Sequence, residues 1–340
     1  MNNPYTWQQM LDDFRTLGGK AENIEQRVGQ FGNGIFPLDP AAPIAIAIPA
    51  PLLVDADQLI LDGADLVVSP ATDVPDEVRN FINRYQKHFS WGANGRKHVD
   101  AFESALKTLP DTLLARLRQI GLLNLAVRHK GPWDEVLRQS FLQSRRISYH
   151  GRKVSMPIIE LINHSAKSPG YLVNDGIQAK GRFADEVTVN YSSTIDALQR
   201  FLIYGFASQE PAAYSLPMHL QLNGGETIHI GYEGDSIHFV NQLPLPKVTT
   251  EAKRRKLSHL RLGAERAPRL PRTLLRKALP DLPVENADEL FDRFRSANEL
   301  ALYELLELAD GVDTPIGKEF RLACLYQLRA MAHCHGVRPD

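Results

Sequence analysis

Residues Met156–Phe206 read MPIIELINHSAKSPGYLVNDGIQAKGRFADEVTVNYSSTIDALQRFLIYGF. This stretch contains most of the residues that suggest a site. An apolar run, Met156–Ile162, leads into the triplet Asn163-His164-Ser165, which we expect in a loop. Strand-like segments follow, and Tyr191 ends one of them, ahead of Tyr204-Gly205-Phe206. Asn and His side chains can donate or accept hydrogen bonds, and Tyr carries a hydroxyl on a rigid ring. The pattern therefore predicts a functional site at the ends of these apolar segments.

The composition of the 340-residue chain is that of an ordinary globular protein, long enough for two domains with separate cores. Hydrophobic residues make up 43% and charged residues 23%, and the formal net charge of −1 gives no general attraction to nucleic acid or membranes. The longest apolar stretch, Ile44–Val54, is interrupted by Pro49 and Pro51 and is too short to cross a bilayer. We therefore expect no membrane partner.

The two cysteines, Cys324 and Cys334, are too few for a disulfide framework or a cysteine zinc cluster. A reducing cytoplasm is therefore the expected location. The first residues lack a basic region followed by an apolar core, so we expect no signal peptide. Instead, Trp7–Leu17 carries apolar residues at helical spacing and predicts an amphipathic helix that stops at Gly18-Gly19.

Upstream of the central stretch, Gly29–Phe36 reads GQFGNGIF. A glycine cluster before an apolar segment can form a phosphate-binding loop, but the dinucleotide-binding motif requires a helix next, and prolines at 37, 40 and 43 exclude one. Two interpretations remain open: an ordinary turn, or a backbone segment whose glycines let it approach a ligand closely.

Residues 77–143 predict a helical insert between strand-rich segments. Apolar residues recur at helical spacing in Val78–Tyr85 and again in Phe102–Ile120, with glycine and proline breaks in this region. Ser144-Arg145-Arg146 closes the insert. An arginine pair at a helix end is usually solvated, so a binding role for it needs support from another feature.

Downstream, residues 217–241 predict a β-meander, because three runs of alternating polarity are separated by glycine-containing turns. His219, His229 and His238 alternate with apolar neighbours, which fits a three-histidine metal site or, as we favour, three solvent-facing side chains. The tract His333-Cys334-His335 is a poor metal site, because adjacent residues point in different directions near a fraying terminus. We therefore expect no metal.

Residues 253–277 contain ten basic residues and one acidic residue, Glu265. Such a segment can bind an acidic partner or nucleic acid, or it can be solvated and neutralised within the protein, which we favour. No aromatic residue lies among the basic ones, which argues against stacking on single-stranded nucleic acid. We do not expect nucleic acid to be a partner.

Four motifs follow one another over roughly residues 25–210. They are Gly32-Asn33-Gly34-Ile35-Phe36, Ser144-Arg145, Leu161-Ile162-Asn163-His164-Ser165, and Glu186–Phe206 with Tyr191 inside it. In this order they resemble the Gly-x-Gly-Leu/Ile-Phe segment, the cofactor-carboxylate arginine, the Leu-x-Asn-His-Ser motif and the Glu-x-x-x-x-Tyr motif with a following Tyr-Gly-Phe. These are the motifs of the SET-domain methyltransferases, in the branch of the Rubisco large-subunit methyltransferase.

The resemblance implies S-adenosylmethionine as the cofactor and a protein as the substrate. The implied site residues are Gly32, Asn33, Gly34, Phe36, Arg145, Asn163 and His164 for the cofactor, Tyr191 for catalysis, and Tyr171, Tyr204 and Phe206 for the acceptor channel. By the same resemblance, Arg145 pairs with the cofactor carboxylate, Asn163 takes its ammonium group, and His164 contacts the adenine mainly through its backbone.

The resemblance also implies an α+β fold, in which a β-rich SET core with a helical insert precedes a mostly helical C-terminal domain with a β-meander. We expect the SET domain at 1–212, with its insert at about 77–143. The C-terminal domain is expected at 213–340, with the meander at 217–241 and helices at about 250–335, and the family uses this domain to help hold a protein substrate.

Three features depart from the family pattern. Glu160 replaces the usual aspartate, Ser192 replaces the usual glycine after the tyrosine, and the loop from His164 to Tyr171 is short. The leading prediction is methylation of a lysine side chain in a protein. Methylation of a protein histidine or of a small-molecule amine is an alternative, and a non-catalytic binding protein with the SET fold is another.

Overall fold

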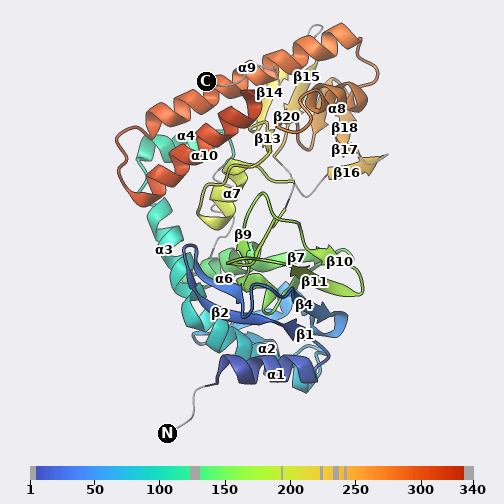
Figure 1. Ribbon diagram of the computed structural model, residues 1–340. Coiled ribbons are helices and arrows are strands. Elements are labelled where there is room, and N and C mark those ends of the chain that lie inside the picture. The colour runs from blue at the N-terminus through green and yellow to red at the C-terminus, as the bar shows by residue number, and fades with distance from the viewer. Residues whose placement is uncertain are drawn as a thin grey trace. The chain divides into compact units, whose positions relative to one another are not determined.

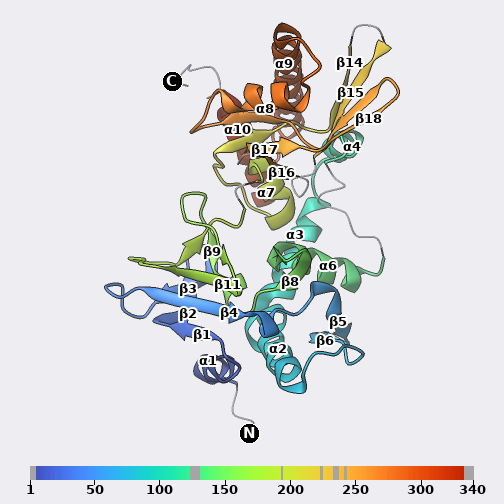
Figure 2. The ribbon, with the colours of Figure 1, turned by 90° about the vertical axis from the view of Figure 1, so that its right-hand side faces the viewer.

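The chain forms two compact units of helices and strands (Figures 1 and 2). The computed structural model describes residues 5–122, 131–192, 194–222, 225–232 and 243–332, and the backbone of 237–240. The first unit comprises Met1–Ser104 with His129–Tyr191, and the second comprises Ala105–Arg128 with Ser192–Asp340. The predicted α+β class is confirmed. No described helix is long and apolar enough to cross a membrane.

The first unit combines short strands with the helices of the N-terminus and of the insert. Its helices are α1 (Trp7–Thr16), α2 (Asp76–Phe89), the π-helical turn η3 (Trp91–Gly95), α3 (Arg96–Leu106), α6 (Trp133–Arg145) and the 3-10 turns η1 (Ala50–Leu52), η2 (Ala56–Gln58) and η4 (Ile159–Leu161). Its strands are β1 (Lys20–Glu22), β2 (Ile24–Gly29), β3 (Gly32–Pro37), β4 (Ile44–Pro49), β5 (Leu59–Asp62), β6 (Asp65–Val68), β7 (Arg146–Tyr149), β8 (Arg152–Ser155), β9 (Asn163–His164), β10 (Leu172–Val173), β11 (Gly176–Gly181) and β12 (Thr188–Val189).

The largest sheet of this unit has four strands in the order β1-β4-β11-β10. In β4, Ile44, Ile46 and Ile48 are buried and alternate with less buried residues, as expected for a strand with one face on a core. Strand β11 pairs with β4 over its full length, in antiparallel orientation. Apart from this sheet, β9 pairs in parallel with β12, and this pairing brings together two distant parts of the central stretch.

Helix α1 packs on β1 and α2. Thr6 caps it in a capping box, in which the Thr6 side chain accepts from the backbone of Gln9 and the Gln9 side chain accepts from the backbone of Thr6. Met10 and Phe14 are fully buried, and Phe14 stacks on Phe81 with ring centroids 5.9 Å apart. The predicted amphipathic helix at the N-terminus is confirmed.

The second unit is built on long helices and a second set of strands. Its helices are α4 (Asp111–Gln119), α7 (Ala197–Tyr204), α8 (Leu270–Ala278), α9 (Val284–Leu308) and α10 (Pro315–Ala332). Its strands are β13 (Ala212–Tyr214), β14 (Met218–Gln221), β15 (Thr227–Ile230), β16 (Ile237–Val240), β17 (Leu243–Pro246), β18 (Val248–Glu251), β19 (Arg254–Leu257) and β20 (Arg261–Ala264).

The predicted β-meander is wrong in its third strand. Strands β14 and β15 form the expected hairpin, but β15 has β19 as its other neighbour, in parallel, and β16 pairs with β17. The helices expected from residue 250 begin only with α8, because β18, β19 and β20 come first. Consecutive strands are neighbours only about two-thirds of the time, so turn signals alone did not identify the partners.

The division into units differs from the boundary expected at 212/213. Helix α7 lies in the second unit, where it packs on α10, so Tyr204 and Phe206 belong to that unit. Helix α4 of the predicted insert also lies there, and its Arg116 donates to Glu304 of α9 at 2.7 and 3.0 Å. The insert is therefore shared between the two units.

The basic segment 253–277 is partly neutralised within the second unit. Its arginines form ion pairs with acidic residues outside the segment, namely Arg255 with Asp281, Arg272 with Asp292, and Arg276 with Asp288. These pairs hold the pKa of Asp281 and of Asp288 below the usual value. The interpretation as an internally neutralised face is supported for these three arginines.

His219 and His229 lie directly opposite each other in the β14–β15 hairpin, and both are exposed. The side chain of His238 and the tract His333-Cys334-His335 lie outside the described residues. Among the residues that the structure describes, no group of histidine, cysteine and acidic side chains could hold a metal ion.

Candidate functional site

The glycine segment forms the end of the β2–β3 hairpin. Gly29 pairs with Gly32 on either side of the two turn residues, and Gly32 has a φ of 92°, which residues with a side chain rarely adopt. No atom lies within 4 Å of the position that a Cβ of Gly32 would take. The turn therefore requires a glycine at 32, and the space beside it is open.

Gly34 is required for a different reason, because side chains pack against its backbone. A Cβ at this position would clash with Oε1 of Glu186 and would lie 2.9 Å from Nδ2 of Asn163. Those two side chains are bonded to each other, since Asn163 Nδ2 donates to Glu186 Oε1 at 2.5 Å. The same Nδ2 donates to the backbone carbonyl of Asn33 at 3.3 Å. Three motifs of the sequence thus meet at one point.

The parallel pairing of β9 with β12 holds the Asn-His-Ser triplet against the segment that leads to Tyr191. Asn163 pairs with Thr188 and His164 with Val189, and the Ser165 amide donates to the Val189 carbonyl at 3.0 Å. A further bond joins the residue before β12 to β3, because the Val187 amide donates to the Ile35 carbonyl at 2.8 Å.

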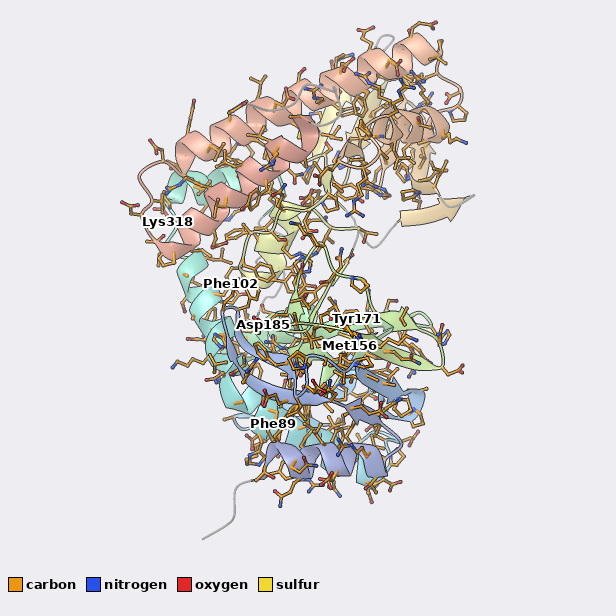
Figure 3. All side chains as sticks on the ribbon, viewed as in Figure 1. Phe89, Phe102, Met156, Tyr171, Asp185 and Lys318 are labelled. Carbon is orange, nitrogen blue, oxygen red and sulfur yellow. The ribbon has the colours of Figure 1, made fainter. Side chains whose placement is uncertain are left out.

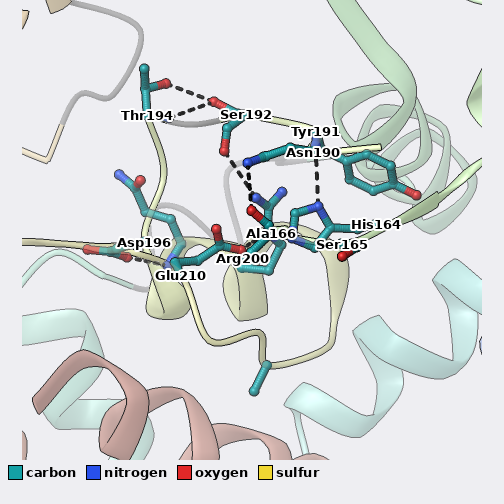
Figure 4. Close-up of polar contacts among 12 residues, drawn as sticks. His164, Ser165, Ala166, Asn190, Tyr191, Ser192, Thr194, Asp196, Arg200 and Glu210 are labelled. Atoms are coloured by element: carbon teal, nitrogen blue, oxygen red, sulfur yellow. Dashed lines mark hydrogen bonds and ion pairs between the residues drawn. The ribbon is translucent and has the colours of Figure 1, made fainter. Parts of the chain in front are cut away.

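Tyr191 is held by two contacts to the triplet region. Its hydroxyl donates to the backbone carbonyl of Ile162 at 2.8 Å. Its amide donates to Nδ1 of His164 at 3.3 Å (Figure 4). The two rings lie 5.1 Å apart. Because Nδ1 of His164 accepts, the neutral form of this buried imidazole carries its proton on Nε2.

A strained turn precedes the triplet. Ile158 is fully buried and has a φ of 69°, and the Ile159 amide donates to the Pro157 carbonyl at 2.9 Å across it. This is the rare form of γ-turn, and a β-branched residue in it costs on the order of 1–3 kcal/mol. The turn redirects the apolar run into η4, and from there into Asn163.

Arg145 lies at the C-terminal end of α6. Its guanidinium lies 4.3 Å from the centre of the Phe141 ring, and its Nη1 donates to Ser144 Oγ at 3.1 Å. Within the described part of the chain, Arg145 forms no ion pair, although its charge acts on Glu160. A cation that is not engaged in an ion pair is suited to binding an anion.

Glu160, which stands where the resembled family has an aspartate, accepts hydrogen bonds from residues of the helical insert. Its Oε1 accepts from the Tyr85 hydroxyl at 3.0 Å and from Ser90 Oγ. Burial raises the pKa of Glu160, while the charge of Arg145 and the two hydrogen bonds oppose that rise. The longer glutamate therefore connects the end of α2 to the segment that carries Asn163.

Two more of the predicted site residues, Phe36 and Tyr171, also lie in the first unit. Phe36 is buried, and the Arg27 guanidinium lies 4.1 Å from the centre of its ring. Tyr171 is partly buried, packs against the hydrophobic core and directly precedes β10 (Figure 3).

Tyr204 and Phe206, the other two predicted channel residues, lie at the end of α7 in the second unit. Their ring centroids are 6.1 Å apart, and Gly205 between them adopts the left-handed conformation that ends the helix. The structure thus brings together Asn33, Gly34, Asn163, His164 and Tyr191 in the first unit. It places Tyr204 and Phe206 as a pair in the second.

A buried ion pair, Arg200 with Glu210, lies beside Tyr204 in the second unit. Arg200 and Glu210 have fully buried side chains, with Arg200 Nε 2.9 Å from Glu210 Oε1. Arg200 Nη2 also donates to the Ser192 carbonyl at 3.3 Å (Figure 4). The guanidinium of Arg200 lies 5.2 Å from the centre of the Tyr204 ring. Ser192 itself shares a hydrogen bond with the Thr194 hydroxyl at 2.8 Å. The serine that replaces the family's glycine thus takes part in a local hydrogen-bonded turn.

Sequence reasoning did not single out Glu186, Glu160 or the Arg200–Glu210 pair as part of a site. Glu186 opens the tyrosine motif, which was the available signal. Glu160 was visible only as a departure from the family pattern. Nothing in the sequence indicated that Arg200 and Glu210 are paired and buried, because charged residues ten positions apart are usually solvated.

No protein-family model and no curated protein matches the chain. Among solved structures, it is similar to Rubisco LSMT bound to AdoMet, with 15% identity, a TM-score of 0.45, and coverage of 97% of this chain and 90% of that one. It is also similar to the SET domain of LSMT bound to lysine and AdoHcy, with 14% identity, a TM-score of 0.40, and coverage of 96% and 88%. At this level of likeness, function has to be inferred from the residues and their contacts.

Proposed function

We propose that this chain is a SET-domain methyltransferase, in the branch of the Rubisco large-subunit methyltransferase, that transfers a methyl group from S-adenosylmethionine to a lysine side chain of a protein. The observation that carries the proposal is the parallel pairing of β9 with β12. Through it, the Asn-His-Ser triplet and the tyrosine motif, which the resemblance assigns to the cofactor and the acceptor, contact each other at His164 and Tyr191.

The residues present fit the amino-acid part of S-adenosylmethionine. An ammonium group needs hydrogen-bond acceptors, and Oδ1 of Asn163 accepts from no described group while its Nδ2 is occupied. A carboxylate needs a cation, which Arg145 can supply. The open space at Gly32 allows a ligand to approach the backbone. The donor and acceptor types therefore match the group that the family uses.

When bound, S-adenosylmethionine supplies an activated methyl group on a sulfonium sulfur. The protein has to align the acceptor amine and exclude water. A lysine amine has a reference pKa near 10.4, so about 1 in 2,500 is neutral at pH 7, a cost of roughly 4.6 kcal/mol. Burial of the amine beside an aromatic ring lowers its pKa and raises the neutral fraction, and within the first unit we assign this task to Tyr171.

Tyr191 is suited to orienting the amine. Its hydroxyl hydrogen is donated to the Ile162 carbonyl, so its oxygen presents lone pairs that can accept an N–H of the amine. Because the phenol keeps its proton in this arrangement, Tyr191 does not serve as a strong base. Its contribution is the position of the nucleophile, for which the contact with His164 provides support.

Two measurements test the proposed function. Calorimetric titration of the purified protein with S-adenosylhomocysteine is expected to show saturable binding, and its absence contradicts the proposal. Radiolabelled methyl transfer into a cell lysate, followed by mass spectrometry of the labelled residue, is expected to give methyl-lysine in a protein. Methyl-histidine or a labelled small molecule identifies an alternative acceptor, and cofactor binding without any label identifies a non-catalytic protein.

Replacing Arg145 should weaken cofactor binding. Arg145→Ala removes the charge assigned to the cofactor carboxylate, and loss of one partner of such a pair costs ~2–5 kcal/mol. We expect calorimetry to show this loss in the affinity for S-adenosylhomocysteine. Arg146→Ala is the matched control, because Arg146 is the next residue and is exposed. Equal affinities of the two variants would refute the assignment of Arg145.

A further inference from the structure

Glu186 occupies a place that the surrounding glycines leave for it. Its Oε1 accepts from Asn163 Nδ2 at 2.5 Å. A Cβ at Gly34 would clash with that same oxygen, and a Cβ at Gly29 would lie 2.9 Å from Oε2 and 2.6 Å from the Phe36 ring. Two glycines of the hairpin thus leave room for one carboxylate. The position of Glu186 is therefore closely defined by its neighbours.

This carboxylate determines which way the Asn163 amide points. With the amide NH2 directed at Glu186 and at the Asn33 carbonyl, Oδ1 is the end that remains for a ligand. A rotation of the amide by 180° would turn Oδ1 toward the carboxylate and the carbonyl, and acceptors would then face acceptors. Without Glu186, one of the two contacts that prevent this rotation is lost.

Glu186 also places a negative charge beside Asn163. Among the described residues it forms no ion pair, while Arg27 pairs with the neighbouring Asp185 at 3.6 Å. Partial burial raises the pKa of Glu186, and the Asn163 hydrogen bond and the charge of Arg27 oppose this. An unpaired carboxylate next to a free amide oxygen attracts a cationic hydrogen-bond donor.

We propose that Glu186 is a positioning residue for the ammonium group of the cofactor: it holds the Asn163 amide with Oδ1 toward the ligand. This inference rests on the proposed function. It assigns the glutamate of the Glu-x-x-x-x-Tyr motif a role distinct from that of Tyr191. It also explains why residue 34 is a glycine, because a side chain there would displace the carboxylate.

Two ligands that differ only in the amino-acid part test the proposal. S-adenosylhomocysteine carries the ammonium group, and methylthioadenosine has the same thioether and nucleoside without it. We expect Glu186→Ala to weaken S-adenosylhomocysteine binding by about 10- to 100-fold, the range for a hydrogen bond to a charged group, and to leave methylthioadenosine binding unchanged. Glu186→Gln should lose less affinity, because its amide oxygen can still accept from Asn163.

The matched control is Asp185→Ala, since Asp185 is the adjacent carboxylate and its side chain is 84% exposed. It should leave the affinities for both ligands unchanged. If Glu186→Ala fails to fold, Glu186→Asp provides the comparison, because the shorter side chain keeps the charge and withdraws the carboxylate from Asn163 Nδ2. Equal losses for both ligands, or no loss for S-adenosylhomocysteine, overturn the proposal. Failure of the wild-type protein to bind either ligand overturns the proposed function as well.

Discussion

Tyr191→Phe is expected to lower the rate of methyl transfer by at least about 10²-fold, the order of loss that follows when a reacting group is misplaced. The variant keeps the ring beside His164 and the amide bond to Nδ1, and it loses the hydroxyl that donates to Ile162. Affinity for S-adenosylhomocysteine should stay within a few-fold of the wild-type value, because the cofactor contacts are assigned to other residues. Single-turnover kinetics and calorimetry separate the two quantities.

Tyr149→Phe is the control for this variant. Tyr149 is buried in the same unit, on β7, and forms no described hydrogen bond through its hydroxyl. The Tyr149→Phe variant should therefore leave the rate of methyl transfer unchanged. An unchanged rate in Tyr191→Phe would remove Tyr191 from the catalytic assignment. A loss of cofactor affinity as large as the loss of rate would move Tyr191 into the cofactor site.

Glu210→Ala should give the largest loss of stability. Arg200 and Glu210 are fully buried, and removal of one partner of a buried ion pair costs about 3–5 kcal/mol. For a unit of this size, we expect the midpoint of thermal unfolding to fall by roughly 6–20 °C. Arg200 also contacts the Ser192 carbonyl and the Tyr204 ring, so these contacts within the second unit should weaken as well.

Two further variants separate the loss of a buried charge partner from other effects. The double replacement Arg200→Met with Glu210→Leu removes both charges and should regain most of the lost stability. Lys318→Ala removes an exposed pair with Asp313 in the same unit and should cost less than about 1 kcal/mol (Figure 3). If Glu210→Ala melts like Lys318→Ala, the pair does not support this unit.

The elements that were predicted well have local patterns. The N-terminal helix follows from the spacing of Trp7, Met10 and Phe14 and from the glycines after it, and the helices of the insert follow from the same period. Helix formation depends on hydrogen bonds between residues four positions apart, so a short window of sequence contains the necessary information. The strands β14, β15 and β16 were also visible as alternating runs.

The pairing of those strands was not visible. The hairpin β14–β15 was predicted because its turn is short. The parallel partner of β15 is β19, and three other strands lie between these two in the sequence. Alternation indicates that one face of a strand is buried, and it does not indicate which strand lies beside it. The same limit explains why the expected meander was wrong.

For the candidate site, the residue types were predictable and their partners were not. The motifs resembled those of a known family, so Asn163, His164 and Tyr191 stood out, and their assigned roles remain predictions. The bond between Asn163 and Glu186 spans 23 residues, and that between Tyr85 and Glu160 spans 75. No periodicity connects residues at such separations.

By itself, the sequence determined the helical segments, the strand-like segments and the set of polar residues that a site could use. The tertiary structure decided that β9 lies beside β12, that Glu186 orients the Asn163 amide, and that Arg200 and Glu210 are buried together. The physical reason is the separation along the chain of the residues that interact. Secondary structure reflects interactions among near neighbours in the chain, whereas the environment of a side chain depends on which distant segments pack around it.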